Sequence, residues 1–136
     1  SSFIQMPNRI NQLTKKSKLE EIFTYAAIRS QIKDNSYKAI MLQNQLAELM
    51  NETDRSIRNY TDTLEKSGLI KYTTKQHAKG EYAHNVYKLD KLEEEYFIMN
   101  PELITEPSIS PKLRGLLMLI KAYCIKGTNY LQFNSI

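Results

Sequence analysis

This sequence has little of what secreted, membrane-spanning or metal-dependent proteins rely on. Among its 136 residues there is one cysteine, Cys124, so no internal disulfide can form, which is typical of a reducing compartment. No run of about 18 apolar residues is present, and no signal peptide opens the chain. One cysteine and two histidines, His77 and His84, do not supply the ligands of a zinc site at any usual spacing. We therefore expect a cytoplasmic protein with no membrane segment, metal or cofactor.

The chain also lacks the features of an enzyme and of a disordered protein. With four glycines and four prolines, and 41% hydrophobic residues, the composition is that of a globular protein. No glycine-rich loop for phosphate is present, and we interpret Glu93, Glu94 and Glu95 as a solvated surface, not as a catalytic cluster. No small-molecule substrate is evident. The net charge of +4 agrees equally with an anionic partner and with an ordinary excess of lysine.

The first third of the chain predicts an arm followed by a very apolar helix. Pro7 disfavours helix before it, so residues 3–14 are interpreted as an extended arm with apolar anchors. Ser17 and Glu20 form a capping box for a helix over 17–33. Its apolar stripe leaves only a narrow polar sector around Glu20, Thr24 and Gln31. Such a helix needs a second cover, and three candidates remain open: the arm, the C-terminal segment, or another chain. Self-association through this helix or the last one is a hypothesis.

The middle of the chain predicts a strand over 38–42 and then two helices joined by a tight turn. Asn44 is placed to cap a helix over 45–50, and Thr53 to cap a second helix ending at Lys66 or Ser67. Gly68 supplies the left-handed residue that commonly ends a helix. Strands over 69–74 and 82–89, with a polar turn at 75–80, complete a hairpin. Beyond it we expect a charged helix over 91–99, a linker over 105–111, a helix over 112–126 and a strand over 130–133.

The second helix of this pair has two opposite faces. A helical period of 3.6 puts Ile57, Tyr60, Thr61 and Leu64 on a packing face, with Arg55, Arg58, Asn59, Asp62 and Lys66 opposite. Arginine can pair with guanine and asparagine with adenine when a helix enters the major groove. We expect Asp62 to orient the guanidinium of Arg58, and the alternatives are that it reads a cytosine amino group or repels DNA. For Arg55, Arg58 and Asn59 the alternative is a solvated helix face. The predicted DNA-contacting residues are Asn44, Gln45, Thr53, Arg55, Ser56, Arg58, Asn59, Lys75, His77 and Lys79.

The segment NQLAELMNETDRSIRNYTDTLEKSGLIKY resembles winged-helix DNA-binding domains. The resemblance implies a mainly α fold with a small β-hairpin (α+β), in which residues 1–100 form the DNA-binding domain with its arm. Residues 101–136 would be a linker, a helix and a short strand. With its FIQMP arm, the chain looks like the N-terminal region of plasmid and phage replication initiators. In those families the resemblance implies binding of repeated origin sequences in double-stranded DNA. A transcriptional regulator, or a winged helix used only for protein contacts, remains open.

A partial repeat bears on the length of the protein. Residues 17–43 resemble residues 110–136: each has a serine, Lys-Leu, an apolar helix, Ile-Lys and a tyrosine before an apolar run. Chance similarity of two amphipathic helices is the alternative. If the repeat is real, we expect the chain to stop where a second winged-helix unit begins.

Overall fold

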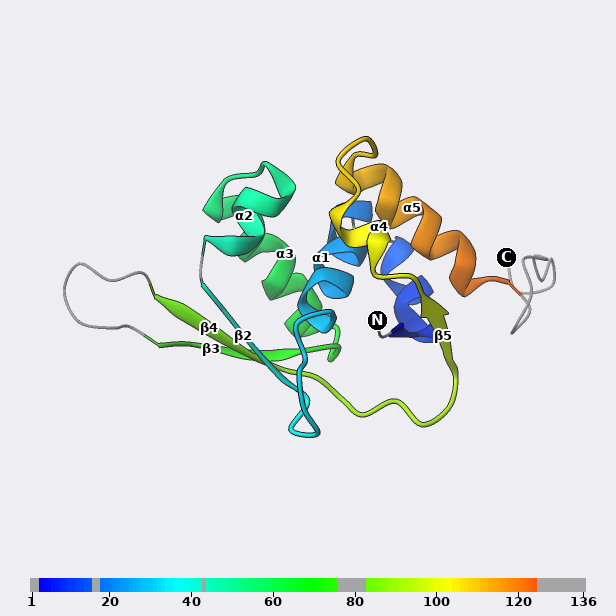
Figure 1. Ribbon diagram of the computed structural model, residues 1–136, viewed down its shortest axis with the longest axis horizontal. Helices are drawn as coiled ribbons and strands as arrows, with labels where there is room; N and C mark the ends of the chain where they lie inside the picture. Colours follow the sequence, from blue (N-terminus) through cyan, green and yellow to red (C-terminus); the bar gives the residue numbers. More distant parts are fainter. Residues whose placement is uncertain (1–2, 16–17, 43, 76–82, 125–136) are drawn as a thin grey trace.

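The computed structural model describes residues 3–15, 18–42, 44–75 and 83–124. Helices and short strands are mixed in one α+β arrangement (Figure 1). The elements, in chain order, are strand β1 (Ile4–Pro7), 3-10 helix η1 (Asn8–Lys15), helix α1 (Leu19–Arg29), strand β2 (Lys38–Leu42), helices α2 (Gln45–Met50) and α3 (Asp54–Lys66), strands β3 (Lys71–Lys75), β4 (His84–Lys88) and β5 (Tyr96–Met99), and helices α4 (Glu102–Thr105) and α5 (Pro111–Ala122).

Helix α1 is the centre of the fold. Every residue from Glu21 to Arg29 is buried, because α3, α5 and β1 all pack against this helix. Both the arm and the C-terminal segment therefore cover it, and α1 has no free apolar face for a second chain. The predicted polar sector around Thr24 is wrong, since the Thr24 hydroxyl is buried and donates to the Glu20 carbonyl at 2.7 Å.

The ends of α1 also differ from the prediction. A helix was predicted over residues 17–33, but α1 ends at Arg29. Lys18 occupies the N-cap position and makes no side-chain hydrogen bond there. Ser17, the predicted cap, lies outside the described residues. Buried Arg29 donates to the Asp90 carbonyl at 2.9 Å, so the helix end is tied to the chain that follows β4.

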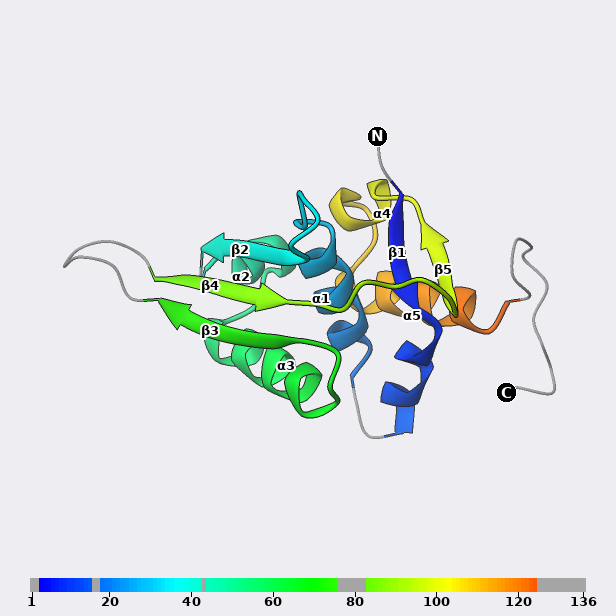
Figure 2. The ribbon, with the colours of Figure 1, turned by 90° about the horizontal axis from the view of Figure 1, so that it is seen from below.

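The hairpin and β2 form a three-stranded antiparallel sheet in the order β2-β4-β3. Ala39 and Met41 of β2 and Tyr87 of β4 are buried on its inner face, and the Tyr72 and Tyr87 rings lie 5.5 Å apart. Figure 2 shows the three strands in front, with α1 and α2 behind them. The strand predicted over 38–42 is confirmed. The two hairpin strands are also present, but the first begins at Lys71 and includes Lys75, which was predicted to lie in the turn, and the second covers only His84–Lys88 of the expected 82–89. Residues 76–82 lie outside the described chain.

The prediction of a charged helix over 91–99 is wrong. Residues 96–99 form β5, which pairs antiparallel with β1, so that Ile4 lies opposite Met99. Phe97 and Met99 are buried while Ile98 is 51% exposed, and this alternation suits a strand. Residues 96–99 therefore form a strand and not a helix, because β1 of the arm offers an edge with which they can pair. The arm itself is extended only over β1 and then continues as η1, where an extended chain was expected.

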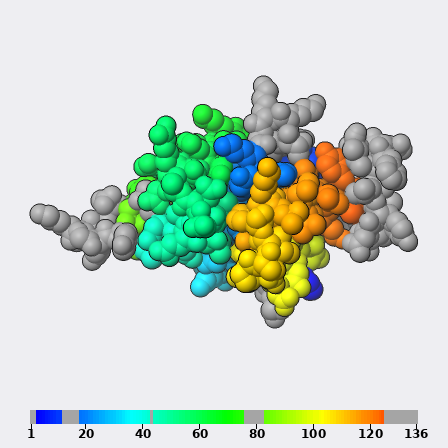
Figure 3. Space-filling view, turned by 90° about the horizontal axis from the view of Figure 1, so that it is seen from above, coloured from blue at the N-terminus to red at the C-terminus, as the bar shows by residue number. Residues whose placement is uncertain are grey.

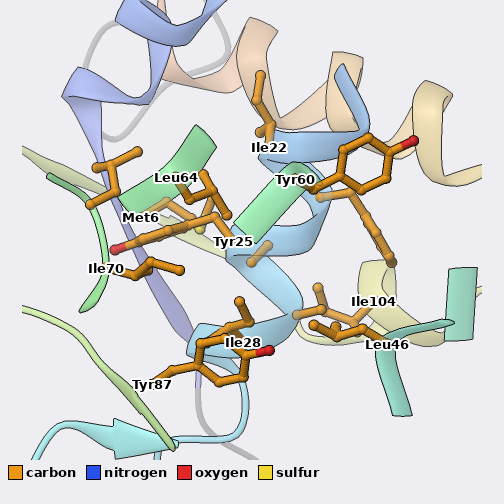
Figure 4. Packing of buried hydrophobic residues seen from close by; sticks show 14 of the residues in the cluster. Met6, Ile22, Tyr25, Ile28, Leu46, Tyr60, Leu64, Ile70, Tyr87 and Ile104 are labelled. Carbon is orange, nitrogen blue, oxygen red and sulfur yellow. The ribbon is translucent and has the colours of Figure 1, made fainter. Parts of the chain in front are cut away.

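The buried side chains form one hydrophobic core around α1 (Figure 4). Met6 of the arm, Leu64 of α3, Tyr87 of the sheet and Met118 of α5 all belong to it. In the view of Figure 3, the surface of α2 and α3 adjoins that of α4 and α5.

The last described helix differs from its prediction only in length. Helix α5 runs over Pro111–Ala122, shorter than the expected 112–126, and Ser110 caps it by accepting from the Leu113 N–H at 3.2 Å. The helix leaves Leu113, Leu117 and Ile120 exposed, and a homodimer through it stays a prediction. Cys124 is half-buried. The strand expected over 130–133 lies outside the described residues.

Candidate nucleic-acid interface

Helices α2 and α3 form a helix-turn-helix whose geometry follows the local sequence signals. Asn51 ends α2 in the left-handed region, with φ 51° and ψ 46°. Thr53 then caps α3, and its Oγ1 accepts from the Ser56 N–H at 3.1 Å. At the other end Gly68 has φ +77°, a conformation that glycine adopts without steric cost. The predicted second helix is confirmed, as are the capping role of Thr53 and the left-handed conformation of Gly68.

The packing face of α3 is the predicted one. Ile57, Tyr60, Thr61 and Leu64 are all buried, each no more than 4% exposed. The Tyr60 hydroxyl donates to Glu52 Oε1 at 3.4 Å. Burial, and then the negative charges of Glu52 and Glu20, raise the pKa of Tyr60 to about 12. The helix is thus held against α1 by side chains on one face alone, which leaves the other face to solvent.

The opposite face of α3 carries the predicted DNA-contacting side chains. Arg55, Arg58 and Asn59 are exposed, as are Asp62 and Lys66. We call Arg55, Arg58 and Asn59 the recognition face. Within the described part of the chain, no hydrogen bond or salt bridge engages the side chain of any of these three residues. Two guanidinium groups and an amide are therefore available to a ligand along the first half of α3.

Asp62 does not play the role predicted for it. Its carboxylate accepts a hydrogen bond from the Tyr72 hydroxyl, and no ion pair with Arg58 is present among the described residues. Burial and the hydrogen bond to Asp62 raise the pKa of Tyr72, in that order. The Tyr72 N–H also donates to Glu65 Oε2 at 3.1 Å. These two contacts join the second half of α3 to β3, so they fix the hairpin relative to the recognition face.

Tyr72 is a neighbour of α3 that the sequence did not reveal. Only the fold brings its hydroxyl from β3 to Asp62 of α3. The one signal in the sequence was that Tyr72 would lie opposite Tyr87 in the hairpin. That signal does not predict the contact of Tyr72 with Asp62.

The remaining predicted residues of the helix-turn-helix are partly engaged within the chain. Asn44 and Gln45 are half-buried at the start of α2. Asn44 makes no capping hydrogen bond, contrary to the prediction, and its Nδ2 donates to Glu48 Oε1 at 3.4 Å. The Thr53 hydroxyl, besides its capping role, donates to Ser56 Oγ at 3.1 Å. These side chains position α2 and α3, while the exposed arginines are the ones free to contact a partner.

The hairpin carries Lys75 beyond the helices. Figure 1 shows β3 and β4 extending away from α2 and α3 toward the turn. Lys75 is exposed at the end of β3, opposite His84 of β4. His77 and Lys79, the other two predicted residues of this segment, lie outside the described residues. A cation at the hairpin end suits contacts with phosphates.

Neither a metal centre nor a membrane-spanning helix is found in the described part of the chain. Within residues 3–15, 18–42, 44–75 and 83–124, no three His, Cys, Asp or Glu side chains are grouped so as to hold a metal ion. No helix there is long and apolar enough to cross a bilayer. Comparison of the chain with protein-family models, with curated proteins and with solved structures finds no match. The geometry of α3 and the hairpin is thus the basis for assigning a function.

Proposed function

We propose that this protein is a winged-helix protein that binds double-stranded DNA, with α3 in the major groove and the β3–β4 hairpin as the wing. The observation that supports it most is the recognition face. Arg55, Arg58 and Asn59 are exposed without partners among the described residues, while the opposite side of the same helix is buried. A helix rigidly held by one face, with bidentate donors on the other, is what readout of base edges requires.

The hairpin supports the same proposal through its position. The contacts of Tyr72 with Asp62 and Glu65 hold β3 against α3, so a helix in the groove brings Lys75 toward the neighbouring phosphates. Contacts to phosphates add affinity with little sequence preference, and they make binding depend on salt. The recognition face therefore supplies specificity, and the hairpin supplies affinity.

The test begins by selecting bound duplexes from a random pool and measuring their binding by fluorescence anisotropy at several salt concentrations. Arg58→Ala should reduce discrimination between the selected duplex and a scrambled one by about 5- to 150-fold, the equivalent of roughly 1–3 kcal/mol. Lys75→Ala should weaken both duplexes about equally and lower the slope of log affinity against log salt by about one.

Lys112→Ala is the matched control, because Lys112 is an exposed lysine that belongs to α5 and not to α3 or the hairpin. It should leave discrimination unchanged. Binding that does not depend on salt, or an unaltered Arg58→Ala variant, would refute the proposal and favour a winged helix used for protein contacts.

The process we propose for this DNA binding is initiation of replication, which the resemblance of the FIQMP arm and the helix-turn-helix implies. In support, the arm is part of the fold, since β1 pairs with β5 and buries Ile4 and Met6. An initiator should select sequences that recur as tandem repeats at a replication origin. Selected sequences that map singly to promoters would instead assign the protein to transcription.

A further inference from the structure

The outer face of the three-stranded sheet carries three lysines in one row. The strand register places Lys38 of β2 and Lys71 of β3 directly opposite Lys88 of β4, one on either side. All three are exposed, and we call them the lysine row. Neighbouring strands are about 4.8 Å apart, so three positive charges lie within a span of roughly 10 Å, and like charges facing each other destabilise a sheet.

The lysine row has no ion-pair partner within the described residues. Salt bridges there, such as those of Arg9 with Asp90 and of Lys91 with Glu93, do not involve the three lysines. Asp34 lies near enough for Lys38 to lower its pKa, but hydrogen bonds from Ser36 are the larger causes. Asp90 lies beside Lys71 and Lys88, but it makes no ion pair with either lysine. Three like charges in one row that form no ion pair within the described residues favour an anionic ligand.

Apolar side chains adjoin the lysine row on the same face. The next row on this face lies two residues away from the lysines on each strand. There the register aligns Ile40 of β2 with Val86 of β4, and Val86 with Thr73 of β3. Ile40 is 66% exposed and Val86 is half-buried. Phosphates along a nucleic acid would contact the lysines but would not cover isoleucine and valine. An acidic polypeptide with its own apolar side chains would do both.

We propose that this outer sheet face binds an acidic polypeptide segment, whose carboxylates pair with the lysine row and whose apolar side chains cover Ile40 and Val86. The sheet face is turned toward the viewer in Figure 2, in front of α1 and α2. It is distinct from the recognition face on α3. The protein would thus hold a protein partner on the sheet in addition to DNA on the helix.

The test uses the full chain and a fluorescein-labelled synthetic peptide in which glutamates flank a pair of leucines. Lys88→Glu places a carboxylate between Lys38 and Lys71, which should raise the temperature of unfolding because opposite charges then face each other. The same change should weaken peptide binding about tenfold or more. A variant that is more stable yet binds less cannot owe its defect to unfolding.

Two further variants distinguish binding at the outer sheet face from a general effect of the protein's net charge on peptide affinity. Lys112→Glu makes the same change of charge on α5 and should alter peptide affinity less than about twofold. Ile40→Ser should weaken the leucine-containing peptide but not a peptide of glutamates alone.

Three results would overturn the proposal. The first is an absence of saturable binding by the peptide, and the second is an equal loss of affinity in Lys88→Glu and Lys112→Glu. The third is a DNA oligonucleotide that displaces the peptide and is itself weakened by Lys88→Glu but not by Lys112→Glu, which would assign the face to nucleic acid. None of these results depends on the recognition face, so failure here is distinguishable from failure of DNA binding by α3.

Discussion

Replacing Gly115 by alanine should destabilise the protein, although the same change stabilises a free helix. Gly115 lies buried in α5 where that helix crosses the start of α1. A Cβ at this position would lie 2.1 Å from the Leu19 carbonyl oxygen and 2.9 Å from its carbon. Ordinary contacts begin near 3.4 Å, so the two helices would have to separate by about 1 Å, which costs contacts throughout their interface.

The magnitude is the balance of two opposing effects. Alanine is about 1 kcal/mol better than glycine inside an unpacked helix. Overpacking typically costs roughly 1–3 kcal/mol and occasionally more, and a Cβ 2.1 Å from an oxygen atom places this contact at the upper end, about 3–4 kcal/mol. Because the obstacle is the carbonyl of Leu19 and not a mobile side chain, we expect a net loss of about 2–3 kcal/mol, or roughly 10 °C in the unfolding temperature.

The assay is thermal and urea unfolding followed by circular dichroism, with Gly68→Ala as the control. A Cβ at Gly68 would meet no atom within 4 Å, but φ is +77°, so that change should cost about 1 kcal/mol from backbone strain alone. If Gly115→Ala is neutral or stabilising, α5 does not pack against α1 as described. The hydrophobic core would then not include Met118 of α5.

Two further predictions concern buried polar groups. Burial raises the pKa of Tyr87 to about 12, so its neutral form is favoured in the folded state; this contribution to stability is complete below pH 10 and is lost as the pH rises through about 12. Tyr60, whose pKa is also raised to about 12, contributes a loss of stability over the same pH range. The loss between pH 9 and pH 12 in urea unfolding should therefore be smaller by about 2–3 kcal/mol in Tyr87→Phe than in the unchanged protein, and an equal loss in the variant would contradict the assignment. Arg114 stacks 4.4 Å from the Phe23 ring centre and donates to the carbonyls of Leu103 and Ile104. Arg114→Met should lower the free energy of unfolding by about 2–3 kcal/mol, because those carbonyls are left unpaired. Amide hydrogen exchange should become faster in α4 but not in α2. Unchanged exchange in α4 would show that Arg114 does not hold that helix in place.

The helix-turn-helix and its two faces follow from local signals in the sequence. The cap at Thr53, the left-handed Gly68 and the 3.6-residue period of Ile57, Tyr60 and Leu64 are local signals, because each acts within a few residues of itself. Their outcome did not depend on the rest of the chain, and so the exposure of Arg55, Arg58 and Asn59 was predictable as well.

Features that depend on partners distant in the chain could not be predicted from local signals. Residues 96–99 form a strand because β1 offers them an edge, and the polar sector expected at Thr24 is absent because α1 is covered from several sides. Asp62 meets Tyr72 and not Arg58 because the hairpin folds back on α3. The lysine row has the same origin: Lys38, Lys71 and Lys88 are far apart in sequence, and only the pairing of three strands places their charges side by side.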